Sequence, residues 1–104
     1  MKLPNLKEEE LRSITSAEGF GVQELATHVG VDLRTLERRF KDQFRMTPKA
    51  WLMKERIRLA ILLLGQGLSN KEVAVYLKYS RESNFCRDFK RCVGRPPQQF
   101  ARGT

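Results

Sequence analysis

Basic side chains surround a narrow apolar stripe in residues 33–44, where the spacing predicts a helix. Leu36, Phe40 and Phe44 recur at four-residue intervals and form the stripe. The charged residues around it are mostly basic: Arg34, Glu37, Arg38, Lys41 and Arg45. Guanidinium and ammonium groups gathered on one surface attract phosphate and carboxylate groups. The chemistry that this stretch indicates is therefore the binding of anions.

The sequence lacks the residues that a catalytic or metal-binding site would need. His28 is the only histidine, so neither a metal cluster nor a Ser/His/Asp arrangement can be assembled. Cys86 and Cys92 lie six residues apart in one predicted helix, a separation that rotates one side chain about 600° from the other. We therefore expect no disulfide, and reduced thiols in an intracellular protein. The sequence predicts no enzyme, no catalytic residue, no bound metal and no cofactor.

The chain carries a net charge of +8 and has an isoelectric point near 10.0, but the excess is unevenly placed. Residues 1–24 hold three basic and five acidic groups, whereas residues 25–104 hold seventeen basic and seven acidic groups. This favours a polyanionic partner, most often nucleic acid, although charge alone is equally compatible with a role in solubility. The longest apolar run has six residues and no signal peptide is recognisable, so no membrane is expected as a partner.

One stretch of the sequence is repeated. Residues 39–51 read RFKDQFRMTPKAW, and residues 88–100, 49 positions later, read DFKRCVGRPPQQF. Identical residues coincide at three places: Phe40 with Phe89, Lys41 with Lys90, and Pro48 with Pro97. The chain is therefore expected to contain two copies of one structural unit.

The periodicity predicts an all-α fold of about seven helices, at about residues 5–16, 22–29, 33–44, 47–65, 69–77, 81–93 and 97–100. Asp32, Thr47 and either Ser69 or Asn70 are expected to cap helices. The helix after Thr47, roughly 27 Å long at about 1.5 Å per residue, would connect the two copies. We expect one domain over residues 1–104, divided into a first unit at 5–46, a linker helix at 47–66 and a second unit at 67–104.

Each copy has the spacing of a helix-turn-helix. Ala26, Gly30 and Leu36 provide the small residue that lets the helices approach, the glycine of the turn and the apolar residue that locks the second helix. In the second copy the counterpart of Ala26 comes 48 positions later and that of Leu36 comes 49 later, so the turn or helix start has gained one residue. Lys78 stands at the glycine position. Because a residue with a Cβ is strained at positive φ, we expect this turn to differ in shape.

The second helix of such a unit fits the major groove of DNA, which is wide enough for one α-helix. Two of these helices on one frame could enter successive groove segments, which lie roughly 34 Å apart on one face of the duplex. The repeat therefore predicts a double-stranded DNA partner.

The chain resembles the DNA-binding domain of the AraC/XylS family of bacterial transcription regulators over about residues 5–102. The resemblance rests on FGVQELA at 20–26, LERRF at 36–40, MTP at 46–48, LSNKEVA at 68–74, FCRDFKR at 85–91 and GRPPQQF at 94–100. It implies a cytoplasmic, nucleoid-associated protein that engages two adjacent groove segments as a monomer and activates transcription through RNA polymerase. The departures are Lys78 and Arg45, where the family often has glycine, and Asn70, where an aliphatic residue is common.

The family pattern also implies which residues touch DNA. The candidates for reading base edges are Arg34, Thr35, Glu37 and Arg38 in the first unit, and Glu82, Ser83, Asn84 and Arg87 in the second. The candidates for phosphate contact are Arg39, Lys41, Arg45, Lys90 and Arg91. Arg34 and Arg38 are favoured because arginine bridges the two acceptors of guanine. Glu37 is expected to orient a neighbouring arginine by a salt bridge, and the alternative is that it accepts a hydrogen bond from cytosine. Asn84 could read adenine and is equally compatible with capping its helix.

A rival hypothesis is a basic helical module that binds an acidic protein partner. Its DNA binding would be indifferent to sequence, and the duplicated units would have no explanation.

Overall fold

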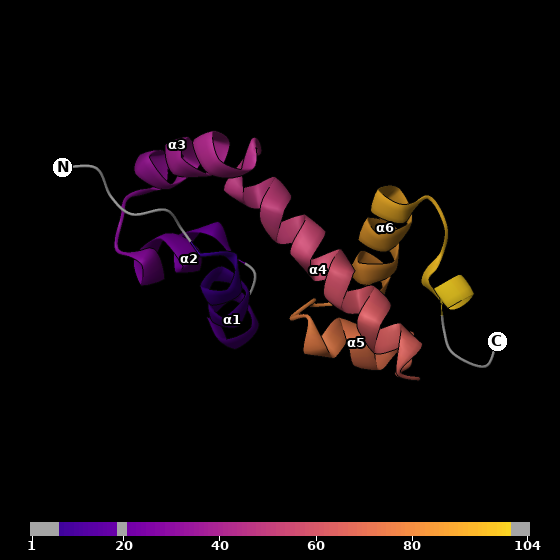
Figure 1. Cartoon of the computed structure of the whole chain (residues 1–104). Coiled ribbons are helices and arrows are strands. Elements are labelled where there is room, and N and C mark those ends of the chain that lie inside the picture. Colours follow the sequence, from indigo (N-terminus) through magenta and orange to yellow (C-terminus); the bar gives the residue numbers. More distant parts are fainter. Residues whose placement is uncertain (1–6, 19–20, 101–104) are drawn as a thin grey trace. The chain divides into compact units, whose positions relative to one another are not determined.

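The computed structural model describes residues 7–18 and 21–100, and these residues form helices and connecting turns. Figure 1 shows the elements in chain order: α1 Glu8–Glu18, α2 Val22–Val29, α3 Leu33–Phe44, α4 Pro48–Gly65, α5 Asn70–Tyr76, α6 Glu82–Val93 and the 3-10 helix η1 Pro97–Phe100. The predicted all-α fold is confirmed. The first helix runs further than predicted, to Glu18 instead of residue 16, and residues 5–6 lie outside the described part.

The chain forms two compact units, Met1–Met53 and Lys54–Thr104, and the division falls within α4. The core of the first unit is apolar and comes from α1, α2, α3 and the beginning of α4: Leu11, Leu25, Ala26, Leu36, Phe40, Trp51 and Leu52. The buried apolar residues of the second unit are Ile57, Ala60, Leu63, Leu64, Val73, Ala74, Leu77, Phe85 and Phe89.

The repeated stretch of sequence produces the same packing in both units. Phe40 meets the edge of Trp51 with ring centroids 5.7 Å apart and planes at 78°. At the matching positions, Phe89 meets Phe100 at 5.3 Å and 72°. Aromatic pairs favour this edge-to-face arrangement. The repeated stretch therefore encodes one aromatic contact in each unit. This contact packs the start of α4 against α3 in the first unit, and η1 against α6 in the second.

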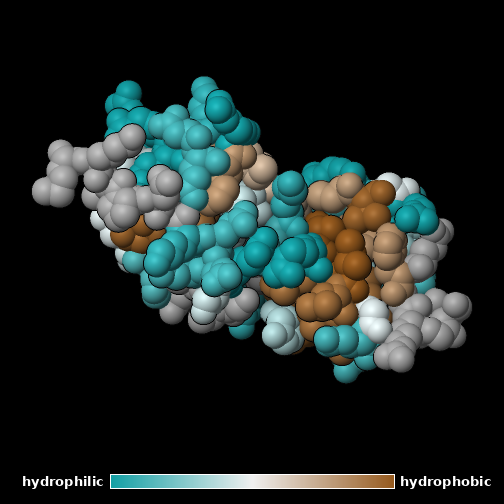
Figure 2. All heavy atoms as spheres, viewed as in Figure 1, coloured by the Kyte–Doolittle hydropathy of each residue, from teal (hydrophilic) through white to brown (hydrophobic). Residues whose placement is uncertain are grey.

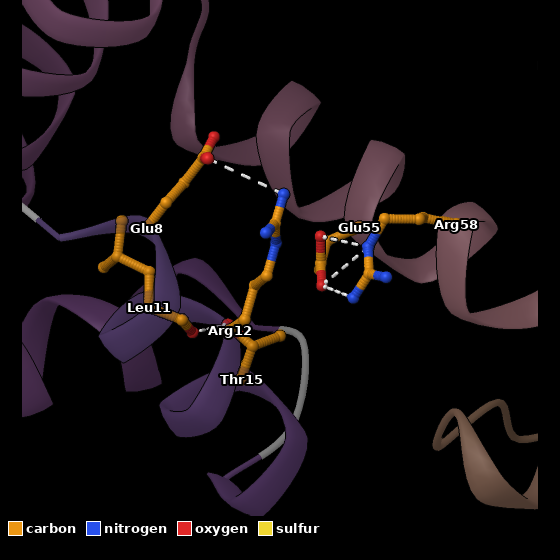
Figure 3. Close-up of polar contacts among 6 residues, drawn as sticks. All are labelled: Glu8, Leu11, Arg12, Thr15, Glu55 and Arg58. Atoms are coloured by element: carbon orange, nitrogen blue, oxygen red, sulfur yellow. Dashed lines mark hydrogen bonds and ion pairs between the residues drawn. The ribbon is translucent and has the colours of Figure 1, made fainter.

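Two buried polar side chains, Thr15 and Glu55, form hydrogen bonds within their own helices (Figure 3). In α1 the hydroxyl of Thr15 donates to the Leu11 carbonyl at 2.6 Å. In α4 the Glu55 carboxylate, 5% exposed, accepts from Arg58 Nη2 at 2.6 Å. Each bond removes the desolvation cost of a group that would otherwise be buried without a partner.

The turns of the two units share a left-handed residue and one hydrogen bond, and they differ in a second hydrogen bond. The Gly30 N–H donates to the Ala26 carbonyl, whereas the Lys78 N–H donates to the Val75 carbonyl. The difference that we expected from Lys78 is thus limited to this bond. Gly30 has a φ of 84° and Lys78 a φ of 67°, both left-handed. The Val31 N–H donates to the Ala26 carbonyl at 3.1 Å, and the Tyr79 N–H donates to the Ala74 carbonyl at 2.9 Å. Both are the six-residue hydrogen bond of a Schellman helix end.

The added residue lies after this hydrogen bond. Val31 directly precedes Asp32, the N-cap of α3, whereas Ser80 separates Tyr79 from Arg81, the N-cap of α6. The insertion therefore lengthens the approach to α6 and leaves the six-residue hydrogen bond in place.

Replacing Lys78 with glycine is expected to stabilise the second unit by about 1 kcal/mol, because glycine takes the left-handed conformation without the Cβ clash. Urea denaturation would measure the change in the free energy of unfolding. A suitable control is Lys90→Gly, since Lys90 is also an exposed lysine but lies inside α6. That change should destabilise by about 1 kcal/mol, and equal effects from the two substitutions would contradict strain at Lys78.

Candidate nucleic-acid interface

Helix α3 is fixed at both ends and along one side. Its N-cap, Asp32, accepts a hydrogen bond from the Thr35 N–H at 2.7 Å, and this bond lowers the pKa of the Asp32 carboxyl. Leu36 and Phe40 are fully buried. At the other end Arg45 takes a left-handed φ of 60°, and its N–H donates to the Lys41 carbonyl at 3.1 Å. The opposite side of α3 is thereby held toward solvent.

The predicted base-reading residues of the first unit lie on this outward side. Arg34, Glu37 and Arg38 are exposed, and Thr35 is half-buried. Because Arg34 and Arg38 are four residues apart in α3, their side chains point in similar directions. The expected salt bridge of Glu37 is absent among the ion pairs formed by the described residues. The region around α3 is largely hydrophilic in Figure 2.

The phosphate candidates of the first unit flank this side of α3. Lys41 and Arg45 are exposed, whereas Arg39 is half-buried. The first unit therefore offers a basic surface in which two exposed arginines occupy the middle.

Helix α6 presents a different surface. Phe85, Asp88 and Phe89 face inward. The candidates that remain exposed are Glu82, Ser83, Arg87, Lys90 and Arg91. Asn84 is half-buried, and its side-chain amide donates to the Ser80 hydroxyl at 3.3 Å. The first turn of α6 thus carries an acidic and two neutral side chains, and its basic groups come later in the helix.

Asp88 is a residue of this surface that the sequence analysis missed. It is 6% exposed, and its carboxylate accepts from the Tyr79 hydroxyl at 3.1 Å and from Arg91 Nη2 at 3.2 Å. Arg87 Nε lies 3.6 Å from the same carboxylate. The signal was available, because Asp88 follows Phe85 by three residues and so falls on the buried side of α6.

Burial raises the pKa of Tyr79 from 10.0 to about 12, and the neighbouring Asp88 carboxylate adds to the effect. A raised pKa in the folded state means that the protonated phenol stabilises the fold. This stabilisation is complete below pH 10 and is lost as the pH rises toward 12. An alkaline titration of phenolate absorbance should show, as the difference between wild type and Tyr79→Phe, a group with a midpoint near 12. A midpoint at the ordinary value would contradict the buried environment of Tyr79.

Other kinds of site find no support in the described part of the chain. No three His, Cys, Asp or Glu side chains there are grouped so that they could hold a metal ion. None of the helices in residues 7–18 and 21–100 has the length and apolar character that crossing a membrane requires.

Residues 25–103 match a family model described as a helix-turn-helix domain. The chain belongs to the AraC-type helix-turn-helix family. This is a family of DNA-binding transcription regulators rather than of enzymes.

Curated relatives of this AraC-type chain include the virulence regulon transcriptional activator VirF of Yersinia enterocolitica and the thermoregulatory protein LcrF of Yersinia pestis. Each is 29% identical over 101 residues, which covers 93% of this chain and 37% of the relative. The chain thus spans little more than a third of the length of these relatives.

Solved structures share the fold. The C-terminal domain of AraT, a response regulator from Geobacillus stearothermophilus, aligns with a TM-score of 0.78 at 23% identity, covering 92% of this chain and 84% of that domain. A DNA-binding transcriptional dual regulator from Escherichia coli K-12 aligns with a TM-score of 0.76 at 19% identity, covering 96% and 92% of the two chains.

Proposed function

We propose that this AraC-type chain is a sequence-specific reader of double-stranded DNA. As a monomer it places α3 and α6 in two adjacent segments of the major groove. The observation that carries the proposal is the duplicated helix-turn-helix. Both units have a left-handed turn residue, the same six-residue hydrogen bond and the same edge-to-face aromatic pair. A basic module for an acidic protein partner has no need of two such units.

The first unit is the stronger reader in this proposal. Arg34 and Arg38 are exposed on one side of α3, and each can donate two hydrogen bonds to the O6 and N7 acceptors of a guanine. Thr35 and Glu37 are the remaining base-reading candidates of α3. Arg39, Lys41 and Arg45 bind phosphates and fix the register of the helix in the groove.

The second unit contributes more to binding of the DNA sugar–phosphate backbone than to reading of bases. Lys90, Arg91 and Arg87 lie in the middle and last turns of α6, and Lys90 and Arg91 are its phosphate ligands. Base contacts from this helix come from Glu82, Ser83, Asn84 and Arg87. Although the Asn84 amide donates one hydrogen bond to Ser80, an amide group has a second N–H and an oxygen, and these can pair with adenine.

Selection of bound duplexes from a random pool, at near-physiological salt, tests this function. Contacts to phosphate alone lose affinity steeply as salt rises, so enrichment under these conditions reports base reading. The proposal predicts two short sequence boxes about one helical turn apart. A single box would contradict base reading by both helices. No enrichment would favour the basic interaction module.

The proposed outcome of binding is activation of transcription through RNA polymerase. Its support is that the relative VirF is named a transcriptional activator. A promoter template carrying the selected site upstream should give more transcript from purified bacterial RNA polymerase when the protein is added. The matched template with a scrambled site should not respond. Equal transcript from both templates would contradict this role.

A further inference from the structure

A series of polar contacts in the second unit begins in α4 and reaches the turn. Arg56 of α4 donates from Nε to the Leu77 carbonyl at 3.1 Å and from Nη2 to the Lys78 carbonyl at 3.3 Å. The same guanidinium lies over the ring of Tyr79, 3.9 Å from its centroid. Arg56 thus holds the left-handed residue through its carbonyl and the next residue through its ring.

The contacts continue from the turn to α6. The Tyr79 hydroxyl donates to Asp88 Oδ2 at 3.1 Å. The other carboxylate oxygen, Oδ1, accepts from Arg91 Nη2 at 3.2 Å and lies 3.6 Å from Arg87 Nε. Asp88 is therefore bound on its buried side by the turn, and it contacts on its outer side two arginines that the proposed function assigns to DNA.

The sequence of the first unit does not provide the side chains for this arrangement. The turn residue that corresponds to Tyr79 is Val31, and the repeat aligns Asp88 with Arg39. Valine has no hydroxyl, and an arginine at the aspartate position supplies no carboxylate. The contacts between Arg56, Tyr79 and Asp88 accompany the turn that has a lysine in place of glycine.

We propose that Asp88 is a positioning residue for DNA binding by α6: it orients Arg87 and Arg91, and Tyr79 and Arg56 fix it in place. This inference rests on the proposed function. An arginine side chain loses rotamer freedom when it binds a phosphate or a base. A buried carboxylate that restrains the side chain beforehand reduces this loss and so strengthens binding. The carboxylate does not touch the DNA itself.

The charge of Asp88 makes a sharp test possible. Removal of a negative charge from a DNA-binding surface should strengthen binding if only the overall field matters. Asp42→Asn is the matched control, because Asp42 is an exposed carboxylate on α3. Positioning predicts opposite signs: Asp88→Asn binds the selected duplex about tenfold more weakly, and Asp42→Asn binds it as well as or better than wild type. Equal strengthening by both changes would overturn the inference.

A second variant covers the case in which Asp88→Asn does not fold. Tyr79→Phe removes only the hydroxyl that holds Asp88, keeps the ring that Arg56 covers and leaves the net charge unchanged. It is expected to weaken binding by about threefold, the size of one lost hydrogen bond, with the loss confined to the segment read by α6. Unchanged affinity in this variant would count against the inference.

A positioning role is distinguished from a purely structural one by the coupling, in DNA-binding affinity, between Asp88 and the two arginines Arg87 and Arg91. If Asp88 acts through them, Asp88→Asn should cause no further loss of affinity in a protein that already carries Arg87→Gln and Arg91→Gln. An undiminished tenfold loss would mean that Asp88 acts through the fold alone. If the wild type prefers no DNA sequence, the proposed function is contradicted, and this inference is contradicted with it.

Discussion

Replacement of Phe89 by alanine is expected to lower the free energy of unfolding by about 3–5 kcal/mol. The side chain is fully buried, and its ring contacts Phe85 at 5.8 Å and Phe100 at 5.3 Å between centroids. Alanine would leave a cavity at the point where η1 is fastened to α6. Since a domain has about 5–15 kcal/mol of stability in total, the variant should be close to unfolding at room temperature. Urea denaturation followed by circular dichroism measures the loss.

The repeat supplies a second variant and a control for this prediction. Phe40→Ala, at the matching place in the first unit, should cost about the same, because Phe40 is equally buried and meets Trp51 in the same way. Phe44→Ala should cost less, because Phe44 is only half-buried. Near-normal stability of Phe40→Ala and Phe89→Ala would contradict the packing described for both units.

Replacement of Arg38 by alanine is expected to weaken binding of the selected duplex by about 1–3 kcal/mol and to relax the preference at one base pair. The reason is that a guanidinium pairs with guanine through two hydrogen bonds, which other base pairs do not offer in the same geometry. Binding measured on the selected duplex and on duplexes with single substitutions gives both quantities.

Lys41→Ala is the control for Arg38→Ala, because Lys41 is an exposed basic residue of the same helix assigned to phosphate. Its loss should weaken binding about equally on all duplexes and reduce the dependence on salt by about one counterion. If Arg38→Ala behaved in this way too, Arg38 would be a phosphate ligand and the reading assigned to α3 would be wrong.

The fold was largely predictable because local signals agreed with it. The four-residue spacing of Leu36, Phe40 and Phe44 predicted a helix there, and the structure bounds α3 at Leu33–Phe44. Capping residues marked the helix starts: the Thr47 hydroxyl accepts from the Ala50 N–H, and Ser69 forms a capping box with Glu72. Caps and apolar spacing act within a few residues, so they can be recognised in a sequence.

The features that were missed depend on residues far apart in the chain. Lys78 was expected to alter the turn because lysine is strained at positive φ, but Arg56, 22 residues earlier, binds its carbonyl. The spacing from Phe85 places Asp88 on the buried side of α6, but only the fold brings the Tyr79 hydroxyl to it. Tertiary contacts of this kind override local propensity, and periodicity does not reveal them.

We propose that both units enter the major groove. Methylation interference at guanine N7, on the duplex obtained by selection, tests it most directly, because N7 lies in the major groove and accepts from arginine. We expect two clusters of guanines whose methylation interferes with binding, about 10 base pairs apart. The interference should be weaker for Arg38→Ala at the cluster that α3 contacts. A single cluster, or two clusters on opposite faces of the duplex, would contradict the proposal.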